Sequence, residues 1–240
     1  MSDSDTNVPR AQIERMIAEN DLQGLLQRAA EIHGHICPGL AAGVKAAATA
    51  MRRLDLQSEG MEDVMAEVEC NNCFVDGIQA VSGCTLGNNA LIYRDLGKTA
   101  VTFYCRGNST GLRLCVREMG PGVALDDDEA EEADRLFEKA VEERKELDET
   151  ESRRFRELWR TAGQGILEMP ADEFFRIETV EVSPPSFAPI FDSAECSVCG
   201  EEVMETRARL QGGEPVCLSC SGEHHWLVHG AGIIPSATGE

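Results

Sequence analysis

Positive charge is scarce in this chain of 240 residues: 22 Lys and Arg stand against 43 Asp and Glu, and the formal net charge is −21. A surface that binds nucleic acid or an anionic membrane needs cations facing the phosphates, so we expect neither partner. The acidity fits ordinary solubility, and it also fits a salt-rich cytoplasm, where ions screen the repulsion between carboxylates. We predict the second, a halophilic protein.

Long apolar runs are missing as well. The residues after Met1, SDSDTNVPR, lack the apolar segment of a secretory signal peptide. No apolar run approaches the roughly 18 residues of a membrane-spanning helix. The chain also has no GxGxxG or GxxxxGK[ST] motif for binding dinucleotides or phosphates. Since 42% of the residues are hydrophobic, we expect a globular cytoplasmic protein without a membrane span.

Helical and strand patterns are both present, which predicts an α+β fold of mixed helices and antiparallel strands. The predicted elements are helices over 22–32 and 38–54, a strand over 64–70, a short helix over 75–81, a strand hairpin over 99–105 and 111–118, two charged helices within 125–167 and a strand over 174–182. The predicted domains are a flexible lead with a first helical segment (1–20), the core (21–182), a Pro-rich linker (183–194), a cysteine ribbon (195–222) and a tail (223–240).

Four of the ten cysteines form two CxxC pairs near the C-terminus, Cys196 with Cys199 and Cys217 with Cys220. One tight turn brings the two sulfurs of a CxxC pair to one ion, and zinc prefers four thiolates in a tetrahedron. We predict a structural zinc in a small ribbon or treble-clef-like domain that depends on the metal for folding. Because four cysteines fill the site, we expect the histidines of HHWLVHG to be solvent-exposed.

A second group of metal-ligand residues lies near the start of the predicted core, in the segment HGHICPG. His33 and His35 leave one predicted helix, and Cys37 stands at the start of the next, where Pro38 suits the first turn. The positive end of that helix favours a thiolate at Cys37. Two imidazoles and one thiolate suit zinc or iron. The alternative is an inert group in which a histidine bonds the backbone and the cysteine is merely buried.

The segment CFVDGIQAVSGC adds three candidates, Cys73, Asp76 and Cys84. Cys73 precedes a short predicted helix and Cys84 follows it, so we expect the loop to bring both toward a common point. We predict a second metal or reactive thiolate held by His33, His35, Cys37, Cys73 and Cys84. Its catalytic candidates are His35, Cys37 and Asp76.

Together, HGHICPGLAAG, CFVDGIQAVSGCTLGNNALIYRDLGK and the following strand pair resemble the FmdE family, which is named after formylmethanofuran dehydrogenase. The resemblance covers about residues 20–175, and a four-cysteine ribbon at 195–222 is a known addition in the family. It implies an α+β core, a homodimer and a metal-lined pocket made of the residues above, with Lys98 as a further candidate.

Two classes of function follow from these patterns. One is a metal-binding enzyme or accessory protein that works with a molybdenum- or tungsten-type oxidoreductase and its subunits. The other is a zinc-ribbon interaction or regulatory protein whose core is a scaffold. HGHICPG favours the first, because a scaffold has no need of such a cluster. Whether the chain is itself an enzyme, and on what substrate, stays open at this point.

Overall fold

The computed structural model describes residues 9–119 and 124–236, and the chain divides into two compact units, Met1–Pro185 and Ser186–Glu240. The boundary falls within the Pro-rich stretch predicted as a linker. Residues 1–8, predicted as a flexible lead, lie outside the described residues. No helix among the described residues is long and apolar enough to cross a membrane.

The first unit is built on a five-stranded mixed sheet in the order β2-β1-β3-β4-β5, in which β1 and β2 are parallel and the other neighbours antiparallel. The strands are β1 (Val64–Val68), β2 (Leu91–Tyr93), β3 (Ala100–Cys105), β4 (Thr110–Val116) and β5 (Phe175–Glu181). The helices before and between them are α1 (Ala11–Glu19), α2 (Leu22–His33), α3 (Pro38–Arg53), α4 (Cys73–Ser82) and α7 (Ala171–Phe174). The α+β prediction is confirmed, although β2 and α7 were not foreseen.

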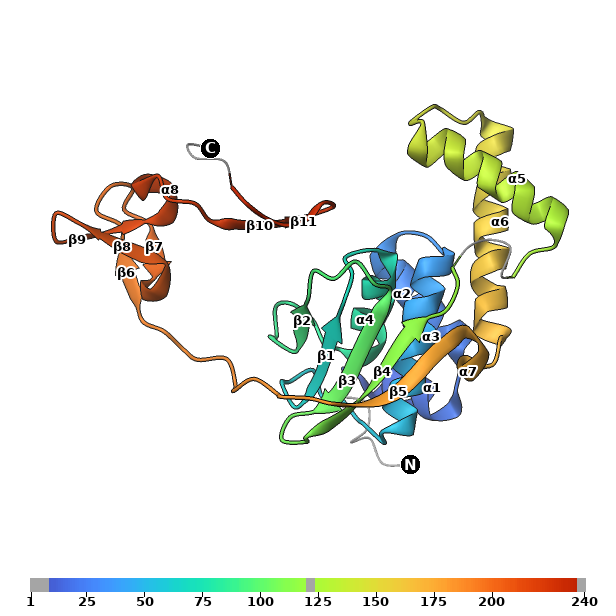
Figure 1. Ribbon diagram of the computed structural model, residues 1–240, viewed down its shortest axis with the longest axis horizontal. Helices are drawn as coiled ribbons and strands as arrows, with labels where there is room; N and C mark the ends of the chain where they lie inside the picture. Colours follow the sequence, from blue (N-terminus) through green and yellow to red (C-terminus); the bar gives the residue numbers. More distant parts are fainter. Residues whose placement is uncertain (1–8, 120–123, 237–240) are drawn as a thin grey trace. The chain divides into compact units, whose positions relative to one another are not determined.

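Helices cover one face of this sheet, and Figure 1 shows the strands lying in front of them. Phe103 of β3 and Leu114 of β4 are fully buried on the covered face, as is Leu40 of α3. Two glycines bring α3 and α4 together: a Cβ on Gly43 would lie 2.0 Å from the carbonyl oxygen of Phe74, and one on Gly77 would lie 2.5 Å from that of Leu40. Because of this close packing, both helices begin next to each other.

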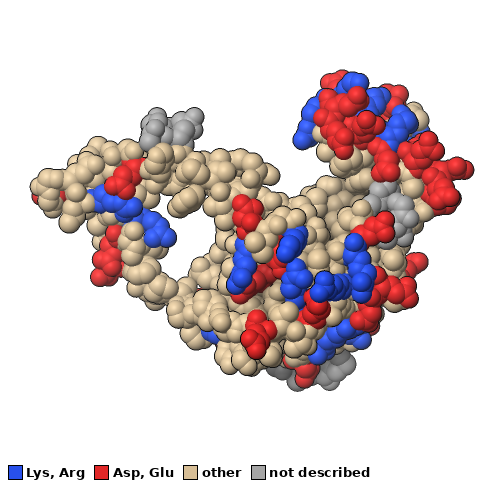
Figure 2. Space-filling model, in the orientation of Figure 1, with Lys and Arg blue, Asp and Glu red and all other residues tan. Residues whose placement is uncertain are grey.

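A helical arm extends the first unit (Figure 1). It consists of α5 (Asp127–Phe137), the π-helical turn η3 (Glu138–Glu142) and the first half of α6 (Glu149–Glu168). Asp148 caps α6 in a capping box with Glu151. The arm has a small core of its own, in which Leu136 and Leu158 are buried against Trp159. Its outer surface is strongly charged (Figure 2).

The described part of the second unit, up to residue 236, contains three strand hairpins and a short helix. They are β6 (Ser193–Glu195) with β7 (Glu202–Met204), the 3₁₀ turn η4 (Glu205–Arg207), β8 (Ala208–Gln211) with β9 (Glu214–Cys217), α8 (Leu218–Ser221), and β10 (Trp226–His229) with β11 (Gly232–Pro235). Most of the predicted tail thus forms a hairpin. The Ser236 hydroxyl lies 3.1 Å from Nδ1 of His225, which is half-buried, whereas His224 and His229 are exposed.

Candidate metal centres

The core group is positioned by two helix ends. α2 ends at His33, and Gly34 turns the chain with a φ of 91°, a conformation that favours glycine. Cys37 is the extended N-cap of α3, ahead of Pro38 in the first turn. The Leu40 amide donates to its sulfur over 3.4 Å. The sequence prediction of Cys37 at a helix start therefore matches the structure.

These helix ends bring three ligand side chains together. One ligand atom each from His33, His35 and Cys37 lies within 4.8 Å of the others. Nε2 of His33 is 3.7 Å from the sulfur of Cys37, and the rings of His33 and His35 are 4.5 Å apart at their centroids. Cys37 is buried, whereas His35 is exposed. The group is therefore open to solvent on the side of His35.

Asp76, predicted as catalytic, contacts a histidine of this group. Its Oδ2 lies 2.7 Å from Nδ1 of His33, and the His33 side chain is only 11% exposed. A carboxylate at this distance accepts a hydrogen bond from Nδ1–H, and in the neutral imidazole this leaves the lone pair on Nε2. Second-sphere carboxylates orient metal-binding histidines in this way. Asp76 is thus placed to position His33.

Cys73, the first residue of α4, lies beside Cys37. A Cβ on Gly39 would stand 3.0 Å from the Cβ of Cys73, which shows how closely the starts of α3 and α4 approach. A hydrogen bond from Cys37 and the nearby His33 lower the pKa of Cys73 to about 6. The same thiol–thiol hydrogen bond and burial raise the pKa of Cys37. The prediction that the helix start favours a thiolate at Cys37 is therefore wrong, because the more acidic thiol of the two is that of Cys73.

Two other predicted residues lie outside the group. Cys84 is fully buried, and its thiol donates to the carbonyl oxygen of Val64 over 3.3 Å. Residues 74–83, most of them in α4, lie between it and Cys73, a rise of roughly 15 Å in a helix. The expected convergence of Cys73 and Cys84 is therefore not met. Lys98 is exposed, in the loop after β2, where its amide donates to the carbonyl oxygen of Glu69.

The donor set of the core group fits a metal ion. Two imidazoles and a thiolate are three ligands of the kind zinc and iron take, and Cys73 is a nearby fourth sulfur. The carboxylate on Nδ1 of His33 supplies the outer-sphere partner that such a histidine needs. Three inner ligands with an exposed side would leave a coordination position for solvent or a ligand.

The four ribbon cysteines lie in two different structural elements. Cys196 and Cys199 lie in the turn between β6 and β7, whereas Cys217 caps α8 and Cys220 lies within it. One ligand atom from each lies within 4.8 Å of the others. A knuckle facing the first turn of a short helix is the treble-clef arrangement of a four-sulfur zinc site.

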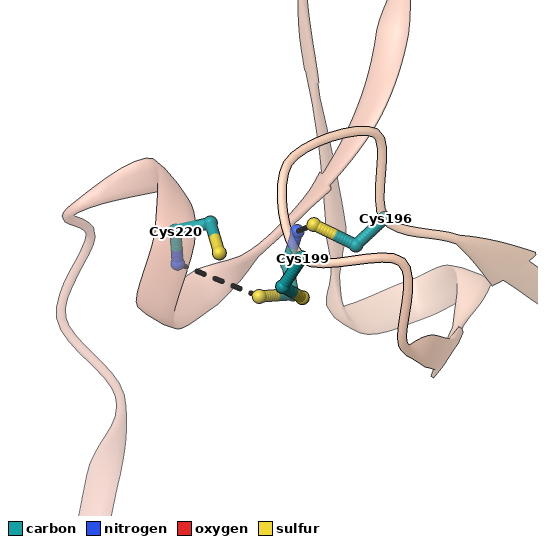
Figure 3. A group of neighbouring side chains, drawn as sticks. Cys196, Cys199 and Cys220 are labelled. Carbon is teal, nitrogen blue, oxygen red and sulfur yellow. Dashed lines mark hydrogen bonds between the residues drawn. The ribbon is translucent and has the colours of Figure 1, made fainter.

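Backbone amides point at these sulfurs, as Figure 3 shows. The amide of Cys217 donates to the sulfur of Cys196 over 3.3 Å, and that of Cys220 to the sulfur of Cys217 over 3.4 Å. Hydrogen bonds from backbone amides, those of Cys199 and Cys217 first, lower the pKa of Cys196 to about 6. These amides favour the thiolate at Cys196, the form in which cysteine binds zinc.

One polar cluster of the core was not foreseen. Glu67 and Glu69 are more than nine-tenths buried on the sheet face away from the helices. Arg94 pairs with Glu67, and Arg113 with Glu69. The signal in the sequence was VMAEVEC, in which two glutamates alternate with apolar residues. Only the structure shows that these two glutamates are buried like the apolar residues with which they alternate.

Two family models match this chain. One, described as FmdE, molybdenum formylmethanofuran dehydrogenase operon, matches residues 32–176. The other, the prokaryotic dksA/traR C4-type zinc finger, matches residues 189–224. The second match and the four-sulfur geometry agree, so residues 189–224 form a zinc finger and zinc is its metal.

Among individual proteins, one from Archaeoglobus fulgidus named "Probable S-adenosyl-L-methionine-binding protein" is 41% identical over 236 residues. The alignment covers 97% of this chain but only 62% of that relative. The crystal structure of a tungsten formylmethanofuran dehydrogenase FmdE-like protein from Syntrophus aciditrophicus matches with a TM-score of 0.52 at 21% identity. That match covers 84% of this chain and 92% of the other, and it shows a shared fold.

Proposed function

The chain belongs to the FmdE family, and on that premise we propose that it is a metal-binding accessory protein of a molybdenum- or tungsten-type oxidoreductase. In this proposal the core holds a second metal besides the ribbon zinc. The observation that carries it is the group of His33, His35 and Cys37, in which Asp76 orients His33 over 2.7 Å. A ribbon on an inert scaffold has no use for an oriented histidine beside a buried cysteine.

Each residue has a distinct part in the proposed site. His33 would bind through Nε2, because Asp76 holds its Nδ1 proton. Cys37 supplies a sulfur that is 4% exposed and thereby shielded from oxidants in solvent. His35 is exposed and would close the open side of the site. A metal bound there would supply a Lewis acid or an activated water molecule.

The accessory role is tested in the host organism. Deletion of the gene should lower the activity of a molybdenum or tungsten oxidoreductase, and the wild-type gene should restore it. A gene with Cys37→Ala should restore no activity, whereas one with Cys105→Ala, which changes a cysteine outside both metal groups, should restore it fully. Restoration by the Cys37→Ala gene would contradict the proposal.

Homodimerisation is a second part of the proposal, and the family resemblance supports it. Light scattering of the purified chain should give twice the mass of 26.2 kDa. A measured mass equal to that of one chain at every protein concentration tested would contradict homodimerisation.

A second candidate function is binding of S-adenosylmethionine. The name of the Archaeoglobus fulgidus relative supports it, and that relative aligns with nearly the whole of this chain. Equilibrium dialysis with the labelled compound is the direct test. Retention of the label by the folded chain would support the candidate, and equal concentrations on both sides of the membrane would contradict it.

A further inference from the structure

The open face of the sheet holds a pocket that the metal centres do not use. Its volume is about 390 Å³, and charged residues of both signs line it, among them Glu67, Glu69, Arg94 and Arg113. Figure 2 shows Lys and Arg next to Asp and Glu over the strands. The register explains the arrangement: Glu67 lies opposite Thr102, and Thr102 lies opposite Arg113.

Two of these side chains are buried acids held in fixed positions. Glu69 accepts from Nε and Nη2 of Arg113 over 2.6 and 2.9 Å. Glu67 accepts from the hydroxyl of Tyr104 over 2.7 Å and lies 2.6 Å from Nε of Arg94. A carboxylate has about four acceptor positions. Each glutamate therefore keeps acceptor capacity for a cation in the pocket.

The two arginines also keep donors. A guanidinium has five N–H donors. In Arg113 two of them bind Glu69 and a further one binds the side chain of Cys115, and in Arg94 one binds Glu67. A bidentate partner fixes the plane of Arg113, so its remaining nitrogen has a defined direction. Arg94 is 59% exposed at the rim. Both guanidinium groups are therefore placed to bind a carboxylate that enters from solvent.

An apolar wall completes the pocket. Val180 and Val182 line it on the side of β5. Gly111 allows this approach, because a Cβ there would lie 3.1 Å from Cγ1 of Val182 and 3.2 Å from Cγ2 of Thr102. The glutamates can bind an ammonium group, the guanidinium groups can bind a carboxylate, and the valines can contact an apolar side chain. These three features together fit an α-amino acid with an apolar side chain.

We propose that this pocket binds the α-amino-acid head group of a small molecule, with its carboxylate on Arg94 and Arg113 and its ammonium on Glu67 and Glu69. S-Adenosylmethionine carries such a head group, so the inference deepens the second candidate function above and rests on it for the larger ligand. L-Methionine has the same head group and tests the pocket separately.

The test is calorimetric titration of the full chain with both probes. The variants are Arg94→Gln and the double exchange Glu69→Gln with Arg113→Gln, which leaves no buried charge unpaired. The control is Arg176→Gln, because Arg176 pairs with Glu178 on the same sheet face but does not line the pocket. We expect both pocket variants to raise the Kd about ten- to a hundredfold and the control to leave it unchanged.

The outcomes separate the pocket from the candidate function. Binding of L-methionine that depends on Arg94, without binding of S-adenosylmethionine, supports the pocket and contradicts the candidate function. Equal binding of S-adenosylmethionine by the wild type and both pocket variants overturns the pocket and leaves the candidate function standing. Absence of saturable binding of both probes up to about 10 mM overturns both.

Discussion

Asp76 of α4 holds His33 of α2 through a carboxylate–imidazole contact of 2.7 Å. The contact joins two residues that are 43 positions apart in sequence. It fixes the tautomer of His33, because the Nδ1 proton lies on the carboxylate side. In the neutral imidazole Nε2 then carries the lone pair, and it lies 3.7 Å from the sulfur of Cys37. In this arrangement one acidic residue prepares a histidine for a metal without touching the metal.

Removal of this carboxylate should weaken the core metal without abolishing it. We expect Asp76→Ala to lower the affinity about 10- to 100-fold, as for other outer-sphere partners of metal-bound histidines. Competition with a calibrated chelator measures the change. Glu31→Ala is the matched control, since Glu31 is an exposed acid on the same helix as His33. Equal affinities of the Asp76 variant and the wild type would show that the carboxylate has no such role.

The ribbon zinc should depend on each of its four cysteines. Cys199→Ser is expected to release the zinc and to make the second unit sensitive to protease, since a domain this small needs its metal to stay folded. The first unit should keep its helical content, because it is a separate compact unit. Zinc content and limited proteolysis measure the two effects. A variant with full zinc and a resistant C-terminal unit would refute this prediction.

Lys45 should make stability depend on pH. It is 3% exposed on α3 and donates to the carbonyl oxygens of Leu167 and Met169. Burial lowers its pKa from 10.5 to about 8. Between these values the unfolded chain binds more protons, so the contribution of Lys45 to the free energy of unfolding should rise with pH.

Urea unfolding of the wild type and Lys45→Met at several pH values isolates this contribution. The difference in free energy of unfolding, wild type minus variant, should grow between pH 8 and 10 by at most about 1.4 kcal/mol per pH unit. It should be constant below pH 7. A difference that stays the same from pH 7 to 10 would mean that Lys45 keeps its proton throughout.

The negative charge should make the protein more stable in salt. We expect its melting temperature to rise between about 0.1 and 2 M KCl, because ions screen the repulsion between carboxylates. Replacing Glu131, Glu138 and Glu142 of the arm by Gln should reduce the rise, since all three are exposed. Scanning calorimetry measures both chains. A melting temperature independent of salt would contradict the prediction.

Sequence reasoning succeeded where ligands are close in the chain. Cys196 and Cys199 share one turn, and His33, His35 and Cys37 lie within five residues, so local geometry alone brings them together. It failed for Cys84, because the length of α4 keeps Cys84, which follows the helix, away from Cys73 at its start. The spacing of residues along the chain does not predict the distance between side chains at opposite ends of a helix.

Long-range packing accounts for the remaining features, of which the sequence predicted only the approach of Cys73 to Cys37. The approach of Cys73 to Cys37 follows from the glycine contacts between α3 and α4. The pocket around Glu67 and Arg113 requires the strand order β1-β3-β4, which no local pattern specifies. The β10–β11 hairpin was missed although it has two short apolar runs around a glycine turn.

The central claim, a metal in the core, is tested most directly by metal analysis of the full chain with all four ribbon cysteines changed to Ser. Inductively coupled plasma mass spectrometry after desalting should find about one metal ion per chain. Adding Cys37→Ala should remove it while circular dichroism shows the helices of the first unit intact. A ribbon variant that keeps its helical content but holds no metal would contradict the account.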